Sequence, residues 1–280
     1  SHRIAAFPAP LRYLFETTQG KSTALNSGIG QAAGRIIVFT DDDVRVPQNW
    51  LEAAVRPLLD DPTIDYTGGP VRPIWGGARP PWLDERGNLG GTIAVKDHGQ
   101  APFIFEERRK TPLGVNMAVR RTLFDAVGGF DAAFGRTGQS LLGQEQAEFF
   151  YRSRRAGARG LYVPSMVLDH QVPSARLTKR YFRRWWYWKG VSQARLHRLH
   201  GETELGLRLS SVPTLAGIPR YLFGNAVRHL GGWIRAAVRA RPIERTEHAV
   251  GLAYVAGYCR ECRFGTRPLA SRTGDTVKRR

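Results

Sequence analysis

The predicted fold is decided by the stretch Gly34-Arg-Ile-Ile-Val-Phe-Thr-Asp-Asp-Asp-Val-Arg-Val-Pro-Gln-Asn-Trp50. Residues 36–39 are β-branched or aromatic without a polar interruption, which predicts a strand covered on both faces, as in a parallel sheet of an α/β domain. Three carboxylates follow at positions 41–43, and ligands of open α/β sheets bind beyond the carboxyl ends of the strands. The stretch therefore predicts an α/β fold with a ligand site at the end of this strand.

The three aspartates are the first candidate site residues. Side chains alternate along a strand, so we expect Asp41 and Asp43 to point to one side and Asp42 to the other. Two carboxylates on one side can share Mg²⁺ or Mn²⁺ with a diphosphate. The alternative is a solvated turn in which one Asp caps a helix that begins at Pro47. Three Asp residues are more charge than a cap requires, which favours the ligand site.

Composition limits the class of protein but does not choose the partner. The chain of 280 residues is long enough for one large α/β domain with an appendage. Its formal charge of +18 attracts polyanions, whether nucleic acid, anionic lipid or phosphorylated substrates. Cys259 and Cys262 are the only cysteines, which excludes a disulfide framework and indicates a reducing compartment. No second ligand pair accompanies them, so an incidental pair is favoured over a redox or zinc site.

The order of predicted elements alternates strands with helices, as in a sheet flanked by helices. Residues 70–112, rich in Pro, Gly and Trp, are typical of a functional lid or a disordered insertion. Their Trp75 and Trp82 either stack on sugar rings or pack in the protein. No stretch of about 18 uncharged apolar residues predicts a membrane span, and the start carries no signal-peptide pattern. Strands are expected at residues 11–16, 36–39, 64–69, 113–121, 160–163 and 166–170, and helices at 20–33, 47–58, 122–127 and 143–157.

Several motifs in this order resemble those of family 2 glycosyltransferases, the inverting, nucleotide-sugar-dependent enzymes of GT-A type. The resemblance covers residues 11–195, and it implies a GT-A (Rossmann-like) mixed sheet flanked by helices. The usual opening strand and the following Asp-rich loop are not found before residue 11, so we expect a fold lacking its first strands. The motifs are Gly20-Lys21, Ala24-Leu25-Asn26-Ser27-Gly28, Phe39-Thr40-Asp41-Asp42-Asp43-Val44, Gly114-Val115-Asn116, Gly128-Gly129-Phe130-Asp131, the acidic helix at 143–157, and Asp169-His170.

The resemblance implies a donor and metal site. Asp41, Asp42 and Asp43 resemble the DxD element of the family, in which Asp41 and Asp43 hold Mn²⁺ or Mg²⁺ and the diphosphate of the donor. His170 resembles the late histidine that completes this site in related enzymes, and a neutral imidazole suits that role; a buried structural histidine is the alternative. The implied donor-binding residues are Lys21, Asn26, Asp41, Asp42, Asp43 and Asn116.

The resemblance also implies a catalytic base. Family members usually show Glu-Asp-x-Glu where this chain reads Glu145-Gln146-Ala147-Glu148. Gln146 cannot accept a proton, so the role passes to Glu145, with Glu148 as the second candidate. A base on one face of the sugar and a metal-held diphosphate on the other fit direct displacement with inversion. For Glu148 and Arg152 the alternative is a solvent-facing i, i+4 ion pair.

Basic and aromatic residues interleave from residue 176 onward. This region resembles, loosely, the Arg- and Trp-containing helix that lines the acceptor groove in the family. The residues that carry this likeness are Arg184, Trp185 and Trp186. The segments 212–238 and 249–258 place Arg among apolar residues, which is typical of helices in a membrane interface; alternatively they pack on the catalytic domain with Arg exposed to water. The predicted domains are a GT-A-like catalytic domain at 1–175, N-terminally incomplete, a basic, aromatic helical region at 176–266 and a disordered tail at 267–280.

The leading hypothesis is a metal-dependent hexosyltransferase that moves a sugar from a nucleoside diphosphate to a hydroxyl, in cell-envelope or surface glycan synthesis. Its predicted partners are a nucleotide-sugar donor, a glycan or lipid-linked acceptor and an anionic membrane surface, and its place is the cytoplasmic face of the membrane. One alternative is an inactive, truncated glycosyltransferase-like fragment. A nucleic-acid-binding protein that uses the basic aromatic region is another, and it does not explain the acidic strand end.

Overall fold

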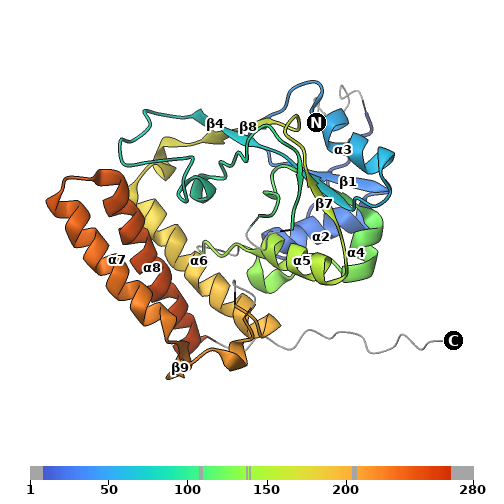
Figure 1. The fold of residues 1–280 in the computed structure, drawn as a ribbon. Coiled ribbons are helices and arrows are strands. Elements are labelled where there is room, and N and C mark those ends of the chain that lie inside the picture. Colours follow the sequence, from blue (N-terminus) through green and yellow to red (C-terminus); the bar gives the residue numbers. More distant parts are fainter. Residues whose placement is uncertain (1–8, 107–109, 137, 139, 204–206, 266–280) are drawn as a thin grey trace.

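The computed structural model describes residues 9–106, 110–136, 138, 140–203 and 207–265 (Figure 1). The helices are α2 (Lys21–Gln31), α3 (Trp50–Asp60), α4 (Arg121–Val127), α5 (Glu145–Arg155), α6 (Lys179–His200), α7 (Tyr221–Val238) and α8 (Pro242–Phe264). The strands are β1 (Ile36–Phe39), β2 (Val44–Arg45), β3 (Tyr66–Gly68), β4 (Val71–Trp75), β5 (Phe103–Ile104), β6 (Met117–Arg120), β7 (Gly160–Tyr162), β8 (Leu168–Val172), β9 (Thr214–Leu215) and β10 (Ile218–Pro219). Four short 3₁₀ turns join them: η1 (Gly90–Ile93), η2 (Ala132–Phe134), η3 (Ser174–Arg176) and η4 (Leu209–Ser211).

A five-stranded mixed sheet forms the centre, in the order β1-β6-β3-β7-β5. Only β3 and β7 pair in parallel; the other neighbours are antiparallel. The predicted mixed sheet is thus confirmed, although β1 itself pairs antiparallel with β6. Its last residue, Phe39, lies opposite Met117, which in turn lies opposite Gly68 at the end of β3. The ends of β1 and β3 and the start of β6 therefore share one edge of the sheet, which we call the catalytic edge.

Helices cover both faces of this sheet, as the apolar character of residues 36–39 predicts. Ile37 and Phe39 face the aromatic core under α2, α4 and α5, whereas Ile36 and Val38 face the core under α3. Figure 1 shows α2, α4 and α5 together on one side of β1 and α3 on the other. Burial of this alternating strand on two sides fixes its register, because a slip of one residue would exchange the two faces.

A second, three-stranded sheet has the order β2-β8-β4. The chain enters it directly after the aspartates, because β2 begins at Val44. Val44 lies opposite His170 of β8, and the backbone amide of Gln171 donates to the carbonyl oxygen of Asp43 at 2.8 Å. The two sheets thus meet at the acidic turn. His170 is brought beside this turn, but it lies in the middle of β8 and not at a strand end as predicted.

Three long helices form the C-terminal part, and α8 lies between α6 and α7 (Figure 1). The backbones of α6 and α8 approach closely at two glycines. A Cβ on Gly190 would lie 2.0 Å from the carbonyl oxygen of Tyr254, and one on Gly257 would lie 1.9 Å from that of Tyr187. Any side chain at either position would force the two helices apart.

The Pro- and Trp-rich segment 70–112 is ordered over its described residues and contains β4, η1 and β5. Trp82 is buried and meets the ring of Phe182 from α6 edge to face, with the ring centroids 5.1 Å apart. Trp75 is partly buried against the same cluster. The sequence left two roles open for these tryptophans, stacking on sugar rings or packing in the protein. The structure shows packing for Trp82.

Several expected elements differ in the structure. The strand expected at 113–121 begins only at Met117, because residues 113–116 form a turn closed by the Asn116 amide and the Leu113 carbonyl oxygen. Residues 11–16 form no strand, because no described strand runs beside them, and Tyr13 and Phe15 are exposed. Helix α3 begins at Trp50 after Asn49, since a turn at residues 47–49 precedes it. Helix α4 is preceded by Arg120 instead of capped by Thr122, because it follows β6 without a linker.

The tail predicted at 267–280 lies outside the described residues. Within the described part, no helix has the length and apolar character that a membrane span requires.

Candidate active site

A cluster of charged groups lies where the acidic turn joins the two sheets. Because Asp43 directly precedes β2, the β2–β8 pairing brings its carboxylate to His170, with 3.5 Å between Asp43 Oδ1 and His170 Nε2. Lys21, the first residue of α2, approaches Asp41 from the other side, with Nζ 3.6 Å from Oδ1. Asp42 is exposed. The structure thus brings Lys21, Asp41, Asp43 and His170 together and leaves Asp42 facing solvent.

His170 is buried, with 3% of its surface exposed, and this governs its charge. Burial lowers the pKa of His170; the charge of Asp43 opposes this effect, and Arg176 in η3 adds to it. The imidazole is therefore neutral at neutral pH, the form in which a histidine binds a metal. Arg176 was not among the residues singled out from the sequence. Its position six residues after His170 was the only signal that could have identified it.

Two polar atoms of the cluster have no hydrogen-bond partner. Asp43 Oδ1 and His170 Nδ1 are both buried without a hydrogen-bond partner. Within the described residues, no three His, Cys, Asp or Glu side chains converge as a ready metal cage. Mg²⁺ and similar ions are commonly held by one or two carboxylates together with substrate phosphates, so an open site of this kind fits them. The donor set thus fits a divalent cation that is completed by a diphosphate.

Helix α5 starts at the catalytic edge. Gln146 in its first turn lies against Gly114, just before β6, where a Cβ would come within 2.2 Å of the Gln146 side-chain nitrogen. Glu145 is buried and accepts hydrogen bonds at 3.0 Å from the backbone of Gln144 and from the side chain of Gln146. Gln144 has φ 145°, a conformation that strains any residue other than glycine. Such strain is typical of functional sites, and Gln144 directly precedes Glu145.

Glu148, one turn later, is held differently. Arg152 donates to both of its carboxylate oxygens at 2.7 Å, and also to backbone carbonyls at Val127 and Gly129. His200 Nε2 lies 3.4 Å from Glu148 Oε1. Burial alone would raise the pKa of Glu148, but the hydrogen bonds and charges of His200 and Arg152 outweigh it and lower this pKa. Glu148 is buried and Arg152 is partly exposed, so the pair is not the solvent-facing one considered from the sequence, and Arg152 occupies both carboxylate oxygens.

Two of the predicted donor-binding residues support the site through backbone contacts. Asn26 exchanges two hydrogen bonds of 2.8 Å with the backbone of Phe130, which ties α2 to the Gly128–Asp131 turn. Asn116 is fully buried; it accepts from Trp50 and donates to the carbonyl oxygens of Pro70 and Met166. Its side chain fastens the loops of the catalytic edge from inside the protein.

The predicted acceptor residues lie on α6. The indole nitrogen of Trp186 donates to Thr92 of η1 at 3.0 Å, and the amine of Lys189 lies over the rings of Trp186 and Trp185. Arg184 is exposed.

The two cysteines lie farther along, on α8, where burial raises the pKa of Cys259 and brings that of Cys262 to about 11. Thiols of such high pKa are weak nucleophiles at neutral pH.

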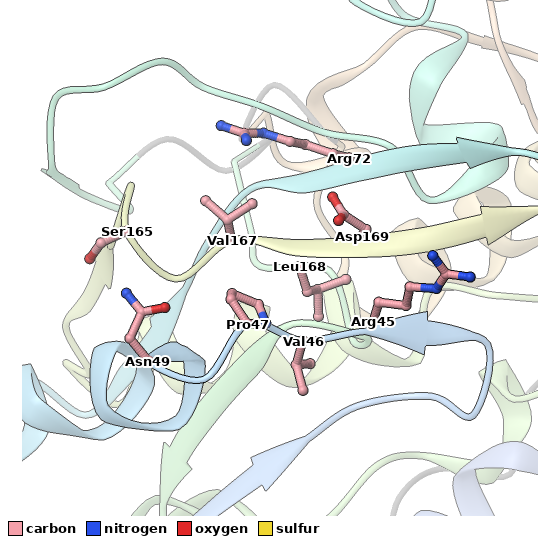
Figure 2. Close-up of a pocket in the computed structure, with 9 residues that line it drawn as sticks. All are labelled: Arg45, Val46, Pro47, Asn49, Arg72, Ser165, Val167, Leu168 and Asp169. Atoms are coloured by element: carbon pink, nitrogen blue, oxygen red, sulfur yellow. The ribbon is translucent and has the colours of Figure 1, made fainter.

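A hollow of about 450 Å³ lies on the second sheet, separate from the cluster (Figure 2). Arg45, Asp169 and Arg72 are direct neighbours across β2, β8 and β4, so their side chains leave the same face of that sheet. His170 is the next residue along β8 and points to the opposite face. The hollow is therefore not the site of Asp43 and His170. Its lining residues are Arg45, Val46, Pro47, Asn49, Arg72, Ser165, Val167, Leu168 and Asp169.

Comparison with solved structures shows the class of fold. The chain resembles the mannosyltransferase PcManGT of Pyrobaculum calidifontis, solved in complex with GDP-Man and Mn²⁺, with a TM-score of 0.51 and 19% sequence identity. The match covers 90% of this chain and 69% of that one. The protein therefore has the mixed α/β architecture of the GT-A glycosyltransferases, with helices added at the C-terminal end.

Sequence comparison identifies the family of the first part of the chain. Residues 2–128 match Glycosyl transferase family 2, so this part of the chain is a family 2 glycosyltransferase domain and the resemblance seen in the sequence is confirmed. Two relatives come from Haloferax volcanii. Glucosyl-dolichyl phosphate glucuronosyltransferase is 25% identical over 179 residues, 64% of this chain and 56% of the relative. Glycosyltransferase AglE is 26% identical over 169 residues, 59% and 49% respectively. The chain thus spans about half the length of the curated relatives it matches.

Proposed function

We propose that this protein is a metal-dependent, inverting hexosyltransferase that moves a sugar from a nucleoside-diphosphate donor to a hydroxyl of a glycan or lipid-linked acceptor in cell-envelope or surface glycan synthesis. The observation that carries the proposal is the pair of Asp43 and His170, with a buried carboxylate oxygen left unpartnered beside Lys21 and Arg176. The GDP-Man and Mn²⁺ named for the Pyrobaculum structure and the dolichyl phosphate named for the first Haloferax relative support the donor, metal and acceptor classes.

On the donor side, Asp41, Asp43 and His170 would hold Mn²⁺ or Mg²⁺. When bound, the ion neutralises the charge that develops on the leaving diphosphate. Lys21 and Arg176 supply positive charge beside the same phosphates. Asn26 and Asn116 contribute by fixing the turns around them, and Asp42, exposed at the same turn, contacts the donor from the solvent side.

On the acceptor side, Glu145 takes the hydroxyl proton as the acceptor oxygen bonds to C1 of the sugar and the bond from C1 to the diphosphate oxygen breaks. Attack from the face opposite the leaving group inverts C1. Glu148 remains the second candidate, although Arg152 occupies its oxygens. Arg184, Trp185 and Trp186 line the acceptor side on α6. We place the reaction at the cytoplasmic face of a membrane, which the lipid-linked acceptor class supports.

The test is thermal unfolding of the chain with UDP-, GDP- and dTDP-sugars, each with and without Mn²⁺. A ligand at about 100 times its Kd stabilises the folded state by about 2.7 kcal/mol, so one donor class should raise the unfolding temperature only with the metal. Asp43→Asn should abolish that shift, and Asp42→Asn, at the exposed neighbour, should reduce it less.

Two outcomes contradict the proposal. A cooperatively folded sample that responds to no donor would favour the inactive fragment. A donor shift that survives Asp43→Asn undiminished would remove the basis for the metal site.

A further inference from the structure

We propose that α7 lies flat on an anionic membrane surface and that its exposed apolar stripe enters the interface. The stripe consists of Phe223, Val227, Leu230, Ile234 and Val238. Their spacing of four, three, four and four residues places all five on one face of a helix. These are large apolar side chains left in water, with 72% of Val227 and 82% of Val238 exposed.

The stripe faces away from the protein. Leu222 and Ala236, on the other side of α7, are buried, and the buried side of the helix packs on α8. Figure 1 shows α7 as the outermost helix of the C-terminal part, with α8 between it and α6. The face that an outside surface would meet first is therefore the apolar one.

Basic residues border the stripe on one side. Arg228, Arg235 and Arg239 each follow a stripe residue directly, so each lies about 100° around the helix from that residue. No acidic residue occurs in α7, and within the described part of the chain none of the three forms an ion pair. Arginines beside an apolar face suit a surface that is apolar inside and negatively charged at its rim, which is the chemistry of an anionic bilayer.

The other border carries an aromatic anchor. Trp233 precedes Ile234, and the guanidinium of Arg245 from α8 lies over its ring at 5.0 Å. Tryptophan side chains favour the headgroup level of a membrane, because one part of the ring is apolar and the N–H is polar. The stripe thus has a cationic border and a tryptophan border, as a helix lying in the interface would need.

A second copy of the chain fits this face less well. Two copies packed stripe to stripe would bring together chains that each carry a formal charge of +18, with no acidic residue on α7 to offset the arginines. Like charges oppose association, whereas anionic headgroups neutralise them. Charge therefore favours the membrane over a dimer.

The same chain offers a matched control on α3. Leu51 and Leu59 are exposed to 54% and 58%, similar to the stripe residues, but they are two isolated side chains. Their helix also carries acidic residues, and Arg56 pairs there with Asp60 at 3.0 Å. This face has neither a continuous apolar stripe nor an unpaired basic border, so it should not bind membranes.

The experiment is co-sedimentation of the full chain with vesicles of phosphatidylcholine alone and of phosphatidylcholine mixed with phosphatidylglycerol, over a range of salt. The wild type should bind the mixed vesicles and bind them less as salt rises. The double variant Val227→Glu with Ile234→Glu should lose roughly tenfold or more in affinity, because two apolar side chains no longer leave water. Leu51→Glu with Leu59→Glu should bind as the wild type does.

The charge contribution has its own variant. Arg228→Gln with Arg235→Gln should lower affinity for the mixed vesicles by about fivefold per arginine and flatten the salt dependence. Circular dichroism with heating would verify that each variant keeps the unfolding temperature of the wild type, as expected for exposed positions.

Three results would overturn the proposal: a wild type that does not sediment with mixed vesicles, a control variant that loses as much binding as the stripe variant, or a wild-type dimer that the stripe variant converts to monomer. The docking itself does not rest on the proposed glycosyl transfer; only its use for a lipid-linked acceptor does. Because α7 is not part of the acidic turn, the stripe variant should keep any metal-dependent donor shift, which separates failure of the docking from failure of the proposed function.

Discussion

Two carboxylate–histidine pairs in this protein have nearly the same separation and opposite character. Asp43 lies 3.5 Å from His170, and Glu148 lies 3.4 Å from His200. Glu148 also receives two hydrogen bonds from Arg152, whereas an oxygen of Asp43 is buried without a hydrogen bond. A histidine beside a carboxylate is therefore not by itself a sign of function; what distinguishes the two pairs is whether the protein already satisfies the carboxylate.

The physical difference is whether the folded protein itself or a bound ligand supplies the partners of the carboxylate. At Glu148 the folded chain compensates the charge itself, so the interaction contributes to stability. The Asp43 side chain is 33% exposed, and only its Oδ1 is buried without a hydrogen bond, so a ligand can still supply a partner for this oxygen. The comparison predicts opposite responses to substitution, in stability at one pair and in ligand binding at the other.

The largest effect is expected from Arg152→Met, which leaves Glu148 buried without its partner. Breaking a buried ion pair from one side costs about 3–5 kcal/mol of unfolding free energy. Urea denaturation would measure it. Arg56→Met is the matched control, because Arg56 and Asp60 form an exposed pair whose loss should cost no more than about 1 kcal/mol. Equal losses in the two variants would refute the interpretation of Glu148 as a structural residue.

The next effect concerns the neighbouring carboxylate, Glu145. Glu145→Gln should slow glycosyl transfer by roughly 10²- to 10³-fold, because a general base contributes in this range. The metal-dependent donor shift should stay as in the wild type, since the proposal assigns Glu145 to the acceptor side. Turnover measured with saturating donor would check this. A variant with normal turnover would assign the proton transfer to another group.

Glu148 should contribute to the acid dependence of stability. Its folded-state pKa lies below the ordinary value of 4.5, so its contribution is complete above pH 4.5 and is lost as the pH falls through the folded-state pKa. The Arg152→Met variant should lose less stability over this acid range than the wild type, because its carboxylate has already lost its main partner. Parallel acid-unfolding curves for the two proteins would contradict this assignment.

The smallest effect is expected for the stability of Asp43→Asn without ligand. This carboxylate gives up no strong hydrogen bond, so the unfolding free energy should change by less than about 1 kcal/mol in either direction. Urea denaturation in the absence of metal and donor would measure it. A loss as large as that of Arg152→Met would make the acidic turn a structural element like the Glu148 pair.

The sequence predicted the local elements of the domain and missed how side chains share hydrogen bonds. The apolar run at 36–39 and the acidic turn after it are where the pattern placed them, because strand burial is a local property. The satisfied state of Glu148 depends on a backbone turn at residues 127–129 and on His200, which are distant in sequence. The burial of Asn116 against Trp50 depends likewise on a contact across 66 positions. Periodicity carries no information about such contacts.

The glycine contacts between α6 and α8 bear on how far the catalytic edge would lie from a membrane. Gly190 and Gly257 let the backbones of α6 and α8 touch, which fixes the distance between these two helices. Helix α7 packs on α8, on the outer side of this pair. If α7 rests on a bilayer, this packing would fix the distance between the lipid surface and the catalytic edge. The protein would then favour acceptors in which the same distance separates the lipid anchor from the hydroxyl that receives the sugar.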